Sequence, residues 1–188
     1  MDITKHKVFI SYHHEKDEFY KLEFERKCQN FIISQAVQFG DYSNDLSDEY
    51  VKRLIREDKI SNSTVVIVLI GADTYKRKHV DWEIYAGLTD RAKGHSGLLG
   101  ILLPSYYASF ENYSLNGIGH NESTLPARFN DNLKSGYAML YNWNNVFQRI
   151  NFRNYNIQTW IEEAFYRKDH NADKIKNSRI QMEYNKVF

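Results

Sequence analysis

The chain has 188 residues, a nearly balanced charge and one cysteine, and these properties exclude several classes of protein. Its length is typical of one domain, with a core large enough for a single sheet and covering helices. The formal net charge of +1 gives no reason to expect nucleic acid or an anionic membrane as a partner. Because Cys28 has no partner for an internal disulfide, and no apolar run has the length of a membrane span or the form of a signal peptide, we expect a cytoplasmic protein.

The first half of the chain alternates between strand-like and helix-like patterns. Val8 to Ile10 is a short apolar run typical of a buried strand, and Ala36 to Phe39 is interpreted as a second strand that ends at Gly40. Between them a first helix is predicted by apolar residues at helical spacing, namely Tyr20, Phe24, Cys28 and Phe31. A second helix, capped by Asp45 or Ser47, has the predicted apolar face Leu46, Tyr50, Leu54 and Ile55.

The alternation continues in the second half. The uniformly apolar run from Val65 to Ile70 predicts a strand that is covered on both faces. A helix is expected to start near His79 or Asp81, because its apolar residues are four apart, at Val80, Ile84 and Leu88. Two further strands are predicted within 96–104 and 136–143, and a last amphipathic helix within 156–168. Strands that alternate with helices indicate an α/β domain with a mostly parallel sheet.

Two segments fall outside this alternation. Residues 105–136 form a connection that is longer than usual, and such connections are more often functional than idle. A short helix is expected there, around 128–133. We assign residues 1–168 to the domain and residues 169–188 to a C-terminal helical extension, whose basic and apolar residues fit either a solvated helix or an arm that contacts a partner.

The candidate site lies where the strands end, because ligands of open parallel sheets bind outside the carboxyl ends of the strands. The residues expected at this edge are Ser11, Tyr12, His13, Asp41, Tyr42, Asn44, His79, Trp82 and Glu83. Glu83 belongs to the first turns of its helix, and Gly87, four residues later, is expected to leave open space on the same face. Spacing alone leaves two interpretations of Glu83: an ordinary acid that favours the helix dipole, or a carboxylate that faces a ligand cavity.

Other kinds of site are not supported. The glycine-rich loops that hold phosphates are missing, and the histidines His6, His13 and His14 lack spaced partners that would complete a metal site, so we expect no metal. Cys28 lies on the apolar face of the first helix, which favours a buried structural thiol over a nucleophile.

The segment KVFISYHHEKD resembles the first conserved box of TIR domains through Phe9, Ser11, Tyr12 and Asp17. The segment STVVIVLIGADTYKRKHVDWEI follows in TIR order and is similar to the part that carries the catalytic glutamate, here Glu83. LPARFNDNLKSGYAMLYNW further resembles the MTH538-like branch, and the chain is similar to TIR-like proteins of the Thoeris antiphage system. It departs from the family in residues 78–82, which precede the glutamate, and in the turn after the second strand, which lacks a proline-glycine pattern.

The resemblance implies a flavodoxin-like three-layer sandwich with strand order 2-1-3-4-5. It also implies cleavage of the nicotinamide–ribose bond of NAD, which is a substrate and not a cofactor, with release of a cyclic ADP-ribose isomer. This messenger would activate an effector that has SIR2 and nucleotide-sensing domains, without stable binding between the two proteins. Glu83 would be catalytic and the other edge residues would bind substrate, while self-association is expected to support activity. The alternative is a non-catalytic TIR-like adaptor that acts by self-association or protein–protein interaction.

Overall fold

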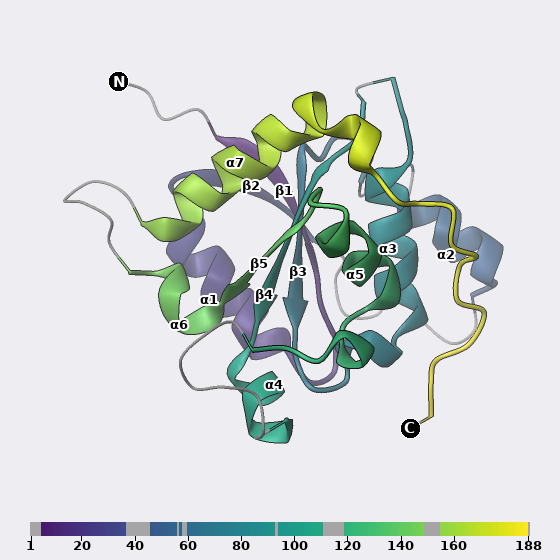
Figure 1. Ribbon diagram of the computed structural model, residues 1–188, viewed down its shortest axis with the longest axis horizontal. Helices are drawn as coiled ribbons and strands as arrows, with labels where there is room; N and C mark the ends of the chain where they lie inside the picture. The colour runs from purple at the N-terminus through teal and green to yellow at the C-terminus, as the bar shows by residue number, and fades with distance from the viewer. Residues whose placement is uncertain are drawn as a thin grey trace.

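A five-stranded sheet forms the centre of the molecule (Figure 1). The computed structural model describes residues 5–36, 46–55, 57, 60–92, 94–110, 119–148 and 155–187. The strands are β1 (His6–Ser11), β2 (Ile32–Ala36), β3 (Val65–Ile70), β4 (Gly97–Leu102) and β5 (Met139–Asn142). Their order is β2-β1-β3-β4-β5 and every neighbouring pair is parallel. The predicted α/β flavodoxin-like class and the strand order are therefore confirmed.

Helices cover both faces of the sheet, so the molecule has three layers (Figure 1). On one face lie α1 (Glu18–Cys28), α6 (Trp143–Val146) and α7 (Asn156–His170). The other face is covered by α2 (Asp48–Leu54), α3 (Lys78–Leu88) and α5 (Ala127–Lys134), and α4 (Pro104–Ser109) follows β4. Short 3₁₀ turns are η2 (Thr74–Lys76), η3 (Glu122–Thr124) and η4 (Ala172–Lys174).

The strands are buried on both faces, which explains their apolar sequences. All six residues of β3 are buried, as its uniform run of β-branched and leucine residues predicts for a central parallel strand. Side chains of β1 alternate between the layers: Val8 and Ile10 pack with α1 and α7, whereas Phe9 packs with α2 and α3. This alternation decides which residues at the end of β1 face the candidate site.

Two predictions about the first half of the chain are wrong in detail. The second strand begins at Ile32, earlier than predicted, because α1 already ends at Cys28 and Ile32 and Ile33 belong to the strand. Of the predicted strand only Ala36 is described, and residues 37–39 lie outside the described part of the chain. The second helix is capped by the Ser47 hydroxyl, as predicted, but Tyr50 is 43% exposed. The face of α2 that meets the core carries Ile55, as predicted, together with Val51, which the predicted face did not include.

The connection over residues 105–136 and the segment over residues 169–188 also differ from their predicted structures. The short helix expected near 128–133 is confirmed as α5, and the long connection also contains α4 and η3. The predicted helical extension over 169–188 is wrong: α7 ends at His170, and after η4 residues 175–187 have no helix or strand. The domain boundary at residue 168 stays a prediction, and α7 runs across it. Among the described helices, none has the length and apolar character that crossing a membrane requires.

Candidate active site

Glu83 lies at the point where the strand order of the sheet reverses. From β1 the chain goes to β2 on one side and β3 lies on the other, so β1 and β3 form the switch point at which ligands of such sheets bind. Ser11 is the last residue of β1, and its hydroxyl donates a hydrogen bond of 2.5 Å to Oε2 of Glu83. Ser11 is 0% exposed and Glu83 is 1% exposed. A buried carboxylate is thus held in one orientation at the edge where a ligand is expected.

The period of two along β1 determines which side chain reaches Glu83. Ser11 points to the layer that contains α3, and Tyr12 packs in the opposite layer with α1 and α7. The Tyr12 hydroxyl donates to Glu18 at 2.5 Å, and its ring stacks on His14. Burial, followed by the hydrogen bond to Glu18, raises the pKa of Tyr12 far above its ordinary value. The structure therefore brings Ser11 to Glu83 and places the side chain of Tyr12 on the other face.

The face of α3 that carries Glu83 packs against the sheet and is not open. A Cβ built on Gly87 would lie only 2.7 Å from Cγ2 of Val66 in β3, so the expectation of open space at Gly87 is wrong. Glycine at this position lets α3 approach β3 closely. The close approach explains how Glu83, one turn earlier on the same face, reaches the end of β1.

Asp17 is a buried acid that the candidate site residues did not include, although it belongs to the first conserved box. Its carboxylate accepts hydrogen bonds from Thr74 at 3.4 Å and Ser105 at 3.3 Å, which follow β3 and β4, respectively. Burial is the main reason why its pKa rises to about 6. A Cβ on Gly71 would lie 2.6 Å from Asp17 Oδ1, so this glycine makes room for the carboxylate. Asp17 therefore joins the ends of three strands.

Two histidines lie near the same edge and are neutral at pH 7. Burial lowers the pKa of His13 to about 4, with Arg77 the next cause, and burial and Lys78 lower the pKa of His79 to about 4. His13 is 2% exposed, and its Nδ1 has no hydrogen-bond partner within the described part of the chain. His79 precedes Glu83 by one turn of α3, and its ring contacts that of Trp82, with 5.1 Å between the ring centroids.

Trp82 faces away from Glu83. Its indole is 1% exposed, and Nε1 donates a hydrogen bond of 2.8 Å to the carbonyl oxygen of Met182 in the C-terminal segment. Its neighbour Asp81 is also buried and forms an ion pair with Arg128 of α5, with 2.9 Å between Oδ1 and Nε. Sequence reasoning missed this pair, because no local pattern connects residues 47 positions apart. The remaining predicted site residues, Asp41, Tyr42 and Asn44, lie outside the described residues.

A parallel sheet in the order 2-1-3-4-5, with an α3 carboxylate held at its switch point, is the arrangement expected of a TIR-like domain. Comparison with known families is more specific: residues 9–108 match the model of the Thoeris protein ThsB, TIR-like domain. Since the match covers more than half of the chain, the protein belongs to this family. A comparison with curated proteins gave no significant match. The matched range contains Ser11, Asp17 and Glu83 and ends before α5.

Proposed function

We propose that the protein is an NAD-consuming enzyme of Thoeris defence that cleaves the nicotinamide–ribose bond. The observation that supports this most directly is the contact of 2.5 Å between Ser11 and Glu83 at the switch point of the sheet. A buried serine that donates to a carboxylate fixes the direction of its oxygens, as a site that must stabilise a developing charge requires. The contact lies within the range that matches the ThsB family.

The chemistry needs one carboxylate. Nicotinamide leaves NAD as a neutral molecule from a cationic pyridinium, so no general acid has to protonate it, unlike the leaving group of an ordinary glycoside. In the proposed reaction Glu83 hydrogen-bonds the ribose hydroxyls and stabilises the oxocarbenium charge that develops at C1. Ser11 orients the carboxylate throughout.

The neutral histidines suit a cationic substrate. Because His13 and His79 have pKa values of about 4, they carry no charge at pH 7 and do not repel a pyridinium ring. We propose them as substrate-binding residues, together with Asp41, Tyr42 and Asn44 from the turn after β2. Tyr12 packs in the layer of α1 and α7, and the indole of Trp82 donates to the carbonyl of Met182, so we do not propose their rings as substrate contacts.

In this proposal the ribosyl group is captured by the adenosine half of the same molecule, which gives a cyclic ADP-ribose isomer. Such capture requires a folded substrate and the exclusion of water. The cyclic product would act in the cytoplasm as a messenger for an effector with SIR2 and nucleotide-sensing domains.

One observation favours the second candidate, a non-catalytic adaptor. Glu83 is 1% exposed and already bonded to Ser11, an arrangement that also serves a purely structural acid. Catalysis therefore requires that the edge above Glu83 opens to admit NAD. We propose that self-association drives this opening, so that specific activity rises with protein concentration.

The decisive experiment measures nicotinamide release from NAD over a range of protein concentrations, with mass spectrometry and NMR of the sugar product. Glu83→Gln is expected to abolish release, and Glu49→Gln, which changes an exposed acid in the first turn of α2, is expected to leave it unchanged. Equal turnover by wild type and Glu83→Gln would refute the role of Glu83. No release by wild type at any concentration, alone or with lysate of phage-infected cells, would favour the adaptor.

A further inference from the structure

The C-terminal segment from Lys176 to Lys186, here called the strap, lies along α3 and α5 on the outside of the molecule (Figure 1). It begins at α5, where the Asn132 side chain donates to the carbonyl of Lys176 at 2.7 Å and accepts from its N–H at 2.9 Å. Next, the Asn177 side chain donates to the carbonyl of Tyr85 on α3 at 3.2 Å. The strap then runs toward the N-terminus of α3, antiparallel to the helix.

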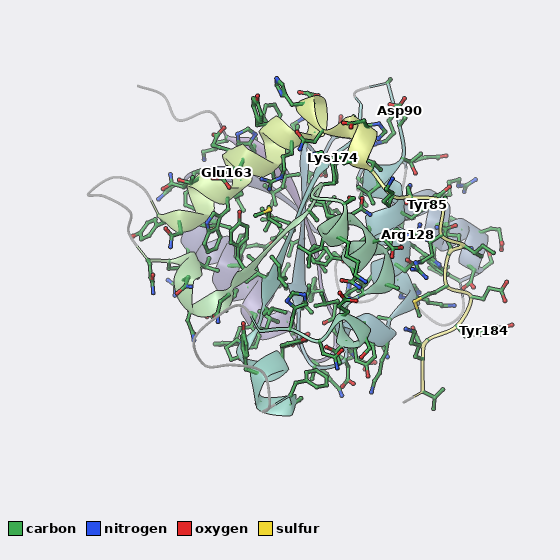
Figure 2. The ribbon with its side chains drawn as sticks, viewed as in Figure 1. Tyr85, Asp90, Arg128, Glu163, Lys174 and Tyr184 are labelled. Carbon is green, nitrogen blue, oxygen red and sulfur yellow. The ribbon has the colours of Figure 1, made fainter. Side chains whose placement is uncertain are left out.

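The middle of the strap is held by both main-chain groups of Met182. Its N–H donates to Asp81 Oδ2 at 2.9 Å and its carbonyl accepts from the Trp82 indole at 2.8 Å. The side chain of Arg128, a residue of α5, lies beside Tyr85 of α3, as Figure 2 shows. It donates to Asp81 and to the carbonyls of Asn177 and Arg179. The middle of the strap is thus held by Asp81 and Trp82, the two residues that immediately precede Glu83, and by Arg128, which pairs with Asp81.

The end of the strap supplies what the start of α3 lacks. The N-cap residue of α3, Arg77, makes no side-chain capping bond. Instead, Oδ1 of Asn185 accepts a hydrogen bond of 2.9 Å from the N–H of Lys78, the first helical residue. The next strap residue, Lys186, donates its N–H to the carbonyl of Lys76 at 2.9 Å. A residue 107 positions later in the chain therefore caps the helix that carries Glu83.

We propose that the strap positions Glu83, with Asn185 as a positioning residue that acts through α3. The proposal rests on the proposed function and adds to it a requirement beyond the segment that matches the ThsB family. The strap fixes the first turn and the middle of α3 against α5. Since Glu83 lies between these points, its carboxylate stays 2.5 Å from the Ser11 hydroxyl. Loss of the cap leaves the first turn free to fray and Glu83 free to leave the orientation that Ser11 sets.

The test compares three variants of the full chain. Asn185→Ala removes the capping oxygen, whereas Asn185→Asp keeps an acceptor and adds a charge that suits the helix N-terminus. Glu183→Ala, which changes an exposed strap residue, is the control. Three quantities are measured: hydrogen exchange of the Lys78 amide, the carboxyl ¹³C resonance of Glu83, and kcat and KM for nicotinamide release.

In Asn185→Ala we expect about fivefold faster exchange at Lys78, as follows from a typical cap. We also expect a displaced Glu83 resonance and a kcat lowered by a similar factor with little change in KM. Asn185→Asp should restore all three, and Glu183→Ala should match wild type.

Two outcomes would overturn the proposal. One is equal exchange at Lys78 in wild type and Asn185→Ala, which means that the cap does not form in solution. The other is faster exchange with an unmoved Glu83 resonance, which means that the cap does not act on Glu83. If wild type releases no nicotinamide, the proposed function fails, but the Glu83 resonance still decides whether the strap positions this side chain.

Discussion

Replacement of Arg128 tests how strongly the buried ion pair with Asp81 stabilises the protein. The Arg128 side chain is 0% exposed and that of Asp81 is 5% exposed, so neither charge is screened by water. Arg128→Met removes the cation and its hydrogen bonds to Asp81, Asn177 and Arg179. The Asp81 carboxylate then keeps the N–H of Met182 as a donor but loses its counter-ion.

The expected loss is large because one buried charge is left uncompensated. Removal of one partner of a buried pair costs about 3–5 kcal/mol, whereas replacement of both partners by apolar residues is often close to neutral. For a domain of this size each kcal/mol lowers the melting temperature by about 2–4 °C, so Arg128→Met should lower it by roughly 6–20 °C. The double variant Asp81→Leu/Arg128→Met should be clearly more stable than the sum of the single effects predicts.

Urea denaturation of wild type, both single variants and the double variant gives the four free energies of unfolding for this cycle. Trp82 offers a second signal, because its indole donates to the strap and its fluorescence should shift to the red when the strap leaves. A loss below about 1 kcal/mol for Arg128→Met, or single effects that add in the double variant, would refute the argument that the pair is desolvated and coupled.

Three further predictions concern the edge of the sheet. Ser11→Ala should lower kcat for nicotinamide release about 10- to 100-fold, the value of a hydrogen bond to a charged group, while a near-normal kcat would contradict the orienting role. Gly71→Ala should lower the free energy of unfolding by about 1–3 kcal/mol in urea, because its Cβ would lie 2.6 Å from Asp17 Oδ1, and an unchanged midpoint would disprove the contact. The pKa of His13 is about 4, against 6.5 when unfolded, so between these values the folded state binds fewer protons and stability is lost as pH falls. His13→Gln should flatten the fall in melting temperature between pH 6.5 and 4, and an unchanged slope would show that His13 is not buried as a neutral ring.

Asp17 changes stability in the opposite direction over the same pH range. Its pKa is raised from 3.8 to about 6, so the folded state binds more protons than the unfolded state between these values. The stability that Asp17 contributes is therefore present at low pH and lost as pH rises through this window. The lowered pKa values of His13 and His79 act against the raised pKa of Asp17. Because two groups lose stability at low pH and one gains it, the net stability of the wild type should still fall when the pH drops from 6.5 to 4.

The sheet could be predicted from the sequence because burial on both faces leaves a clear signal in each central strand. Val65 to Ile70 is uniformly apolar, and the helices between strands show their spacing of four. The start of the second strand could not be predicted, because Phe31 to Ile33 continues the apolar spacing of the preceding helix. No local pattern separates the end of a helix from the start of a strand when the apolar residues are continuous.

The site could be predicted only in part. Glu83 and Ser11 follow from the order of conserved boxes, but whether a helix face is open or packed depends on the distance to the sheet, as Gly87 and Val66 show. The strap leaves almost no signal at all. It is held largely by main-chain groups of residues such as Lys176 and Met182, and these groups are the same in every sequence.

The contacts around α3 also limit how the edge can open for a substrate. Ser11 holds Glu83 from the sheet side, Arg128 fixes Asp81 from α5, and Asn185 caps the first turn from the strap. A movement of α3 alone, away from the sheet, from α5 and from the strap, would break all three sets of contacts, including a buried ion pair. Access to Glu83 at lower cost would come from side chains and turns at the carboxyl ends of the strands. In the proposed enzyme, activation by self-association should therefore leave the amides of α3 protected from hydrogen exchange while the exposure of Glu83 increases.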